Sequence, residues 1–354
     1  MHKGVGYALL AAILFGASTP FSKILVTELA PITLAGILYL GSGIGLLVWF
    51  ALRALIVGRQ REVNAYLTLE DLPWLAGAIL AGGICGPVLL MFGLSLTAAS
   101  TTSLLLNTEG VFTALLAWFV FKENFDKRIF FGMMFIVIAG VLLVWQEQGA
   151  HAGMHWGGWA ILAACFCWAI DNNLTRKIAA GDAVQIAGIK GLVAGTVSLV
   201  IAQVQGFSMP SLDIALTAGV VGFCGYGLSL VAFVLALRHL GTARTGAYFS
   251  IAPFTGAAIS LLVLGEIPDW GFWLAAVLMA IGIWLHMTEM HRHQHIHAQL
   301  FHTHAHSHGI HHRHTHDFPC DINKSHVHAH QHERLDHAHP HFPDIHHRHQ
   351  HDEE

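Results

Sequence analysis

The sequence predicts an all-α integral membrane protein in which ten transmembrane helices form two inverted five-helix repeats. Three observations predict this fold: the composition, an internal repeat and the placement of basic residues. Of the 354 residues, 54% are hydrophobic and only 11% are charged, against roughly 25% charged in an average soluble domain. We therefore expect most of the chain to lie in lipid.

Apolar stretches of about 20 residues, long enough to cross a hydrocarbon core of about 30 Å, recur along the chain. They lie near residues 5–26, 32–57, 73–95, 99–121, 129–145, 157–178, 184–205, 213–237, 243–264 and 270–288. The first stretch is too long for the apolar region of a signal peptide and no cleavage-site pattern follows it, so we expect it to remain as a span. The five cysteines form no paired framework and are expected to be free thiols.

The first half of the chain returns in the second half. Residues 6–12 (GYALLAA) return 152 positions later as residues 158–164 (GWAILAA), and residues 83–86 (GICG) match residues 222–225 (GFCG). Because such blocks recur in the same order, chance is a poor explanation. Duplicated membrane units are typical of secondary transporters. The predicted units are residues 1–145, residues 146–290 and a tail at 291–354.

Lysine and arginine fall in alternate loops. The basic loops carry Lys3; Arg53, Arg59 and Arg61; Lys122, Lys127 and Arg128; Arg176 and Lys177; and Arg238 and Arg244. The loops between them, near residues 28–31, 96–99, 146–156, 206–212 and 265–270, carry none. The positive-inside rule therefore predicts that both termini are cytoplasmic, and we expect a bacterial inner membrane. Since each copy has an odd number of spans, the second copy enters the membrane from the opposite side.

Glycine and proline interrupt several predicted spans. The breaks fall at residues 16–20 in the first span, 82–87 in the third, 222–227 in the eighth, and at Pro253 in the ninth. A lipid-facing helix could not leave the freed backbone groups unpaired, so we expect these stretches to face protein or a wet cavity. The alternative is that small residues only permit close helix packing, as we expect for residues 41–45.

These features resemble the EamA family of the drug/metabolite transporter superfamily. The resemblance covers about residues 4–288 and includes the opening at residues 14–18 (LFGAS) and a fourth span of each copy that ends in a glutamate, Glu123 or Glu266. It implies a ten-helix carrier that exports small metabolites through a cavity between the repeats. The chain departs from the family at residues 108–110 (TEG), where members often carry a proline, and around Tyr39, where many carry an arginine. The substrates of other members are therefore not transferred.

Ionisable residues inside the predicted spans are the main site candidates. Glu109 lies near the middle of the fourth span, where a carboxylate costs a few kcal/mol on insertion scales. Low dielectric favours its uncharged form, which suits a proton-coupling or cation site. The alternative is a structural Glu109, hydrogen-bonded to Asn107 or Thr108, that only fixes helix packing.

A second candidate pair lies near the cytoplasmic side. Asp171, followed by Asn172, is about seven residues from the end of the sixth span, and Lys190 is about seven residues into the seventh. At 1.5 Å per residue both lie roughly 10 Å deep. We expect an ion pair, either on the substrate path or only joining two neighbouring helices.

The remaining candidates lie at span ends or beside the glycine breaks. Glu123 and Glu266 are expected to be helix-end caps or gate residues, and Lys23 is expected to snorkel to the interface. Cys85 and Cys224 occupy equivalent places in the two copies, where two thiols could meet a soft metal ion. The alternative, a small buried residue beside each break, is the more common role of a free cysteine.

The tail has a different composition, since 23 of its 64 residues are histidine. With almost no apolar residues it is expected to be disordered. Neutral imidazole is a good ligand for Zn, Ni, Co and Cu ions, so we expect the tail to bind a transition metal, although the core requires no cofactor. The expected ligands are His302, His304, His306, His308, His311, His312, His314, His316, His326, His328, His330 and His332.

Two functions remain open. One is export of a divalent metal ion, with the tail as collector, and this is favoured because of the tail. The other is proton-coupled export of an amino acid or other small metabolite, with the tail as a regulatory or storage appendage. An enzyme is not expected, because residues 332–336 (HERLD) lack the second histidine of a zincin helix and no Gly-x-Ser-x-Gly elbow occurs. The expected partners are the bilayer and the solute or metal ion, without nucleic acid, and a homodimer is left open.

Overall fold

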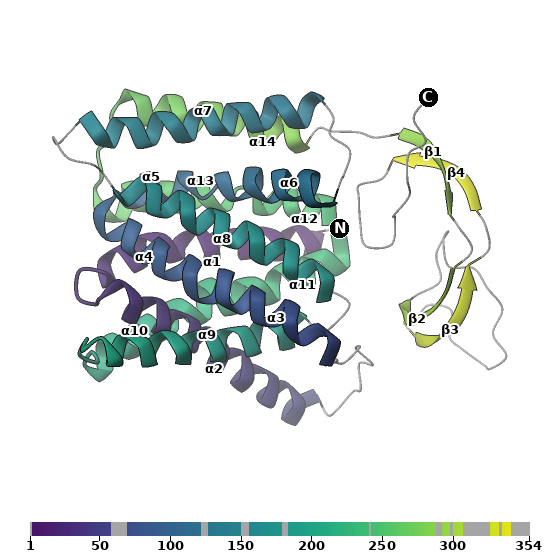
Figure 1. Ribbon diagram of the computed structural model, residues 1–354, viewed down its shortest axis with the longest axis horizontal. Coiled ribbons are helices and arrows are strands. Elements are labelled where there is room, and N and C mark those ends of the chain that lie inside the picture. Colours follow the sequence, from purple (N-terminus) through teal and green to yellow (C-terminus); the bar gives the residue numbers. More distant parts are fainter. Residues whose placement is uncertain are drawn as a thin grey trace.

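The computed structural model describes residues 2–57, 69–121, 127–149, 156–178, 183–240, 242–287, 292–297, 300–306, 326–332 and 335–340. Helices occupy the described chain up to Met287 (Figure 1). In the first copy they are α1 His2–Leu25, α2 Pro31–Val57, η1 Leu69–Asp71, α3 Leu72–Ala78, η2 Ile79–Cys85, α4 Gly86–Leu96, α5 Ala99–Leu105, α6 Thr108–Phe121 and α7 Lys127–Gly149. In the second they are α8 Trp156–Ile178, α9 Ala183–Val204, α10 Leu212–Gly222, η3 Phe223–Leu228, α11 Ser229–Leu240, α12 Thr242–Phe249, α13 Ala252–Leu264 and α14 Trp270–Met287.

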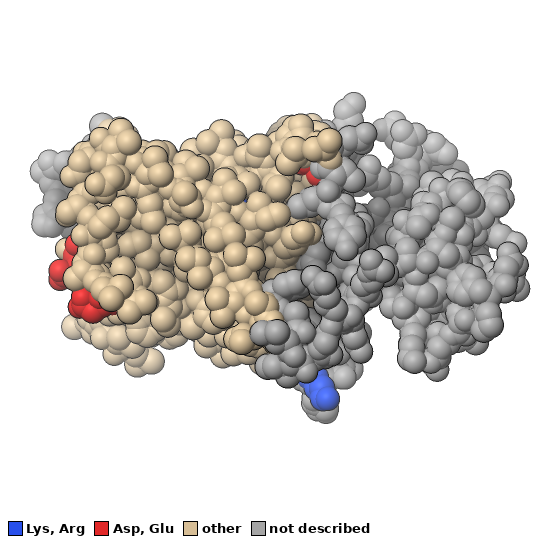
Figure 2. All heavy atoms as spheres, turned by 90° about the horizontal axis from the view of Figure 1, so that it is seen from below, with Lys and Arg blue, Asp and Glu red and all other residues tan. Residues whose placement is uncertain are grey.

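Six helical stretches among the described residues are long and apolar enough to cross a membrane. They are Lys3–Leu25, Pro31–Trp49, Leu72–Leu96, Arg128–Trp145, Val184–Val204 and Leu212–Ala236. Two shorter apolar helices cover Ala252–Leu264 and Trp270–Leu285. The surface in Figure 2 is almost free of charged groups over the described helices, and acidic side chains gather at one end. Many large hydrophobic side chains are exposed on the described helices, and an uncharged surface of this kind suits contact with lipid rather than water.

The third and eighth spans are interrupted by a wide turn at equivalent positions, as the sequence predicts. Both η2 and η3 are π-helical, and each joins two α-helices in one continuous rod. The predicted break in the ninth span is also present, because α12 ends at Phe249 and α13 begins at Ala252, directly before Pro253. Wide turns of this type leave carbonyl groups without their usual helical partner.

The predicted break in the first span is wrong, because α1 continues from His2 to Leu25 with Pro20 inside it. Gly16 instead packs against α13, where a Cβ would collide with the carbonyl of Ala252 and lie 2.9 Å from the backbone nitrogen of Gly256. The small residues here permit close helix packing, which is the alternative that the sequence left open. The fourth span has a break that was not predicted, at Leu106 and Asn107 between α5 and α6.

The first helix of each copy packs against the other copy. Helix α1 packs on α11, η3 and α13, whereas α8 packs on α4, η2, α3 and α6. We call α1, η3, α11 and α13 the α1 bundle, and α8, η2, α4 and α6 the α8 bundle. Flanking layers pair equivalent spans, with α7 beside α14 on one side and α2 beside α9 on the other (Figure 1).

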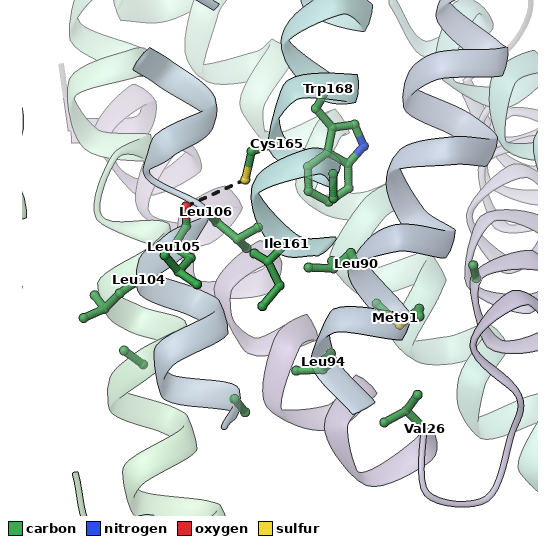
Figure 3. Packing of buried hydrophobic residues seen from close by; sticks show 14 of the residues in the cluster. Val26, Leu90, Met91, Leu94, Leu104, Leu105, Leu106, Ile161, Cys165 and Trp168 are labelled. Carbon is green, nitrogen blue, oxygen red and sulfur yellow. Dashed lines mark hydrogen bonds between the residues drawn. The ribbon is translucent and has the colours of Figure 1, made fainter. Parts of the chain in front are cut away.

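The largest buried apolar cluster joins both copies. It includes Leu94 of α4, Leu105 of α5, and Ile161 and Cys165 of α8, each with no exposed surface. Figure 3 shows these side chains meeting between the helices, with the Cys165 thiol 3.7 Å from the carbonyl oxygen of Leu105. This packing fixes α8 against α4 and α5 of the first copy.

The described backbone of the tail forms four short strands. Strand β1 (Arg292–His297) pairs with β4 (Leu335–Pro340), and β2 (Leu300–His306) pairs with β3 (His326–His332), both antiparallel. Most of residues 288–354 lie outside the described part of the chain, and the disorder expected of the tail stays a prediction.

Candidate functional site

The central feature of the site is a polar cluster between α6 and α8. The break at Leu106 and Asn107 ends α5, so that Glu109 lies in the first turn of α6. Its Oε1 accepts a hydrogen bond of 2.8 Å from Nδ2 of Asn172, and the same nitrogen lies 3.4 Å from Oγ1 of Thr113. Since Thr113 is four residues after Glu109, both side chains share one face of α6.

This cluster lies on the inner face of α8. Trp159 and Phe166 are exposed on the outward face of α8, whereas Ile161 and Cys165, on the opposite face, have no exposed surface. Asn172 lies on that same inner face, seven residues after Cys165, yet it is exposed, and Glu109 is only half-buried.

The ion pair expected between Asp171 and Lys190 is present. Oδ2 of Asp171 contacts the Lys190 ammonium, and Oδ1 accepts a hydrogen bond of 3.0 Å from Oγ1 of Thr175. Asp171 is buried, and its carboxylate lies where a side chain on Gly82 would be. The glycine in the wide turn thus makes room for the charged pair.

The carbonyl of Gly82 is held by two side-chain donors that sequence reasoning missed. It accepts hydrogen bonds of 2.8 Å from the hydroxyl of Tyr39 and 2.9 Å from Nε1 of Trp168. Because η2 is a π-helical turn, this carbonyl lies where the regular helical ladder is interrupted, and the two donors satisfy it. The glycine pair at residues 82–83 was the signal that a carbonyl here needed partners.

The charged pair and the tyrosines form one unit around Gly82. The carbonyl oxygen of Gly82 accepts from the hydroxyl of Tyr39, and the Asp171 carboxylate lies beside the same glycine. The rings of Tyr39 and Tyr226 of η3 are 5.6 Å apart. The unit therefore includes side chains from both copies.

Aromatic side chains continue from this unit along the α1 bundle. The ring of Phe15 lies 5.9 Å from Tyr226 and 5.6 Å from Phe249, and Phe249 lies 4.9 Å from Phe233. Such edge-on and tilted contacts are favourable in an apolar setting. The arrangement gives the centre of the molecule a polar side on α6 and α8 and an aromatic side on α1, η3 and α12.

Asn107 and Thr108 are not partners of Glu109, contrary to the structural alternative drawn from the sequence. Nδ2 of Asn107 donates to the carbonyl oxygen of Leu104 and lies 3.6 Å from the sulfur of Met279. The hydroxyl of Thr108 donates to the carbonyl oxygen of Leu105. Both side chains therefore satisfy the helix break, whereas Glu109 is bonded across to α8.

The two cysteines predicted beside the wide turns are not part of this cluster. Cys85 is exposed, and it lies two helical turns before exposed Phe92, which places it on an outward face of the span. Cys224 is half-buried in η3. Within the part of the chain that the structure describes, no three His, Cys, Asp or Glu side chains gather closely enough to hold a metal ion.

Several predicted residues fall outside this description. Glu123 lies outside the described residues, as do His308, His311, His312, His314 and His316. The backbone alone is described for His302, His304, His306, His326, His328, His330 and His332.

Two charged residues bind helix ends at the opposite end of the bundle. The ammonium of Lys23 donates to the carbonyl oxygens of Leu94 and Thr97, at 2.6 and 2.7 Å, and the snorkelling of Lys23 to the interface stays a prediction. Glu266 accepts from the backbone nitrogens of Ala99 and Ser100, at 2.8 and 2.9 Å. It therefore caps α5, a helix of the other copy.

Comparison with known proteins gives consistent matches. A model of the EamA-like transporter family matches residues 2–145 and 155–288. An uncharacterized transporter of Methanothermobacter thermautotrophicus is 28% identical over 270 residues, which cover 72% of this chain and 78% of that protein. A probable terminal-alkyne amino-acid exporter of Streptantibioticus cattleyicolor is 28% identical over 204 residues, covering 56% of this chain and 67% of that protein. One solved crystal structure, 17% identical, shares the fold with a TM-score of 0.57 and covers 79% of this chain and 95% of that one.

Proposed function

Because the chain belongs to the EamA-like transporter family and is a membrane transporter, we propose that it exports a small polar organic solute, such as an amino acid, in exchange for protons. The observation that carries the proposal is the carboxyl group of Glu109, which is half-buried and bonded to the exposed Asn172 on the inner face of α8. An ionisable group at such a position is costly in a membrane, and groups of this kind mark substrate or proton pathways.

Glu109 is the proton site of this proposal. A carboxyl group in low dielectric can exchange its proton for a solute without leaving a charge exposed to lipid. Asn172 and Thr113 supply neutral hydrogen-bonding groups beside it, and Asp171 with Lys190 offers one negative and one positive charge nearby. A solute that carries both an ammonium and a carboxylate can use each of these groups. The amino-acid exporter among the relatives supports this solute class.

The proposed architecture has ten spans in two inverted repeats, with both termini in the cytoplasm. The wide turns at equivalent positions in η2 and η3 support the repeat. The exchange of first helices between copies supports a site at the repeat interface, where inverted-repeat transporters bind their solutes. Alternating access then consists of closing one end of that interface while the other end opens.

Export of a divalent metal ion is the second candidate, and one observation in the tail favours it. Antiparallel pairing of the β2 and β3 backbones sets histidine opposite histidine at three alternate positions, His302 with His330, His304 with His328, and His306 with His326. Neutral imidazole is a good ligand for transition metals.

The test is flux through the full-length protein in liposomes that carry an imposed pH gradient. Vesicles are loaded with single amino acids or with Ni, Co, Zn or Cu salts, and both solute efflux and proton uptake are measured. Glu109→Gln keeps the size and hydrogen-bonding reach of the side chain but cannot lose a proton. We therefore expect this variant to lose gradient-driven efflux and to retain solute exchange at equal pH.

The control is Asp213→Asn, which neutralises an exposed carboxylate at the start of α10 and should leave both fluxes unchanged. Gradient-driven efflux that persists in Glu109→Gln contradicts the coupling role. Removal of residues 291–354 separates the two candidates, because amino-acid efflux should persist without the tail whereas tail-dependent metal efflux should fall.

A further inference from the structure

The turn between α4 and α5, at residues 96–98, is held from both sides by charged groups. Lys23 donates to the carbonyl oxygens of Leu94 and Thr97, near the end of α4. Glu266 accepts from the first two backbone nitrogens of α5, those of Ala99 and Ser100. Each charge matches its helix end, because carbonyls at a C-terminus attract a cation and N–H groups at an N-terminus attract an anion.

Both charges come from the α1 bundle, whereas the turn belongs to the chain that leads from α4 of the α8 bundle. Lys23 is in the last turn of α1. Glu266 follows Gly265, which ends α13 with a positive φ of 65° and redirects the chain. The contacts of Lys23 and Glu266 with this turn therefore join the two bundles rather than stabilise one of them.

The two bundles meet at this end of the molecule. Helix α5, which belongs to neither bundle, packs on α13 and α1 and also contacts α8, and α1 contacts α4 directly. At this contact Gly256 of α13 is so close to its neighbours that a Cβ would lie 2.7 Å from both the Gly16 carbonyl oxygen and the Ser103 hydroxyl. A side chain at this position would force the helices apart.

The opposite end is arranged differently. Helix α6, the second half of the fourth span, packs on α8, and α12, the first half of the ninth, packs on α1 and α11. Helix α6 therefore packs within the α8 bundle, and α12 packs beside the α1 bundle. Asn172, exposed on the inner face of α8, lies toward this end. The contacts between the bundles thus gather near Glu266 rather than near Glu109.

We propose that Lys23 and Glu266 form a latch that holds the Glu266 end of the interface closed, and that both sets of contacts break when that end opens during transport. The inference rests on the proposed alternating-access function, because a transporter of this kind must open each end in turn. Removing either charge shifts the protein toward the state in which this end is open and the other is closed.

Amide hydrogen exchange on the full-length protein in nanodiscs tests the latch without a transport assay. Glu266→Gln replaces one accepting oxygen by an amide nitrogen, which cannot accept from an N–H group. We expect exchange at Ala99 and Ser100 to rise about tenfold. Because the ends open reciprocally, exchange in α6 and α12 should fall by about threefold. Lys23→Met should give changes of the same sign in both regions.

The matched control is Asp269→Ala, which removes the accepting oxygen together with the charge. Asp269 accepts a hydrogen bond of 3.1 Å from the backbone nitrogen of Phe272 and so caps α14, which is the same chemistry without a link between bundles. This variant should raise exchange at the start of α14 only. If both latch variants accelerate exchange near α5 and leave α6 and α12 unchanged, the contacts are local caps and the latch is rejected. Since no solute is involved, that result is distinct from a failure of the flux experiment.

Discussion

The buried pair of Asp171 and Lys190 shows how a few residues can set both stability and function. The Lys190 side chain is 18% exposed and that of Asp171 is 7% exposed, so water contributes little to either charge. A buried charge left without its partner is strongly destabilising, whereas replacing both charges by apolar groups is often neutral. The stability role and the transport role of this pair can therefore be separated by substitution.

We predict that Asp171→Leu or Lys190→Met alone lowers the free energy of unfolding by about 3 kcal/mol, because each leaves one buried charge unpaired. The double variant should regain most of this loss. Thermal or denaturant unfolding in detergent measures the three changes. If the double variant is folded but does not transport, the pair belongs to the solute path. If it transports normally, the pair only joins α8 to α9.

Counting residues along the spans was enough to predict this pair, because a helix rises by a fixed 1.5 Å per residue and both residues lie near span ends. The partner of Glu109 was not predictable in the same way. Asn107 and Thr108 are its neighbours in sequence, but both bond to carbonyls of the α5–α6 break. Asn172 becomes the partner only because tertiary packing sets α8 beside α6.

At the scale of elements, the wide turn η2 is the part of the fold on which the charged pair depends. Its glycine pair was visible in the sequence, and the break predicted there is present. The same reasoning was wrong for α1, where the glycine and proline lie in an unbroken helix. The sequence is similar in both places, but at Gly16 the backbone of α13 fills the space, whereas at Gly82 a carboxylate does. Only the neighbouring element distinguishes the two cases.

We predict that Gly82→Ala destabilises the protein and displaces Asp171, since the added methyl group would occupy the position of the Asp171 carboxylate. Overpacking of this kind typically costs about 1–3 kcal/mol. The matched control is Gly188→Ala in α9, where a Cβ would have nothing within 4 Å. This substitution should be tolerated. Melting temperatures of the two variants measure the difference. Equal melting temperatures would show that Asp171 adjusts without cost.

At the scale of the whole molecule, the first helix of each copy packs among the helices of the other copy. The composition and the internal repeat were sufficient to predict a helical membrane protein with equivalent halves, because apolar spans and their order are written directly in the sequence. The exchange of α1 and α8 between the bundles was not predictable. It depends on which apolar face fits which neighbour, and all of the spans present apolar faces.

We predict that a chain cut within residues 150–155 regains function only when both fragments are expressed together. Residues 2–149 contain α4 and α6 but lack α8, and the other fragment contains α11 and α13 but lacks α1. Each fragment alone should therefore be degraded or aggregate, and co-expressed fragments should purify together. Stable, monodisperse single fragments would show that each copy folds independently.

The same exchange of helices has a consequence for how the protein is made. Helices α1 through α7 leave the ribosome before α8 has been synthesised. During this interval the third and fourth spans are in the membrane without the helix that packs on them. Throughout that interval Glu109 lacks the amide of Asn172, and a membrane-embedded chaperone or the insertion machinery itself has to shelter a carboxyl group. Nascent chains stalled just after residue 149 should therefore crosslink to such factors through α6, and chains long enough to expose α8 should not.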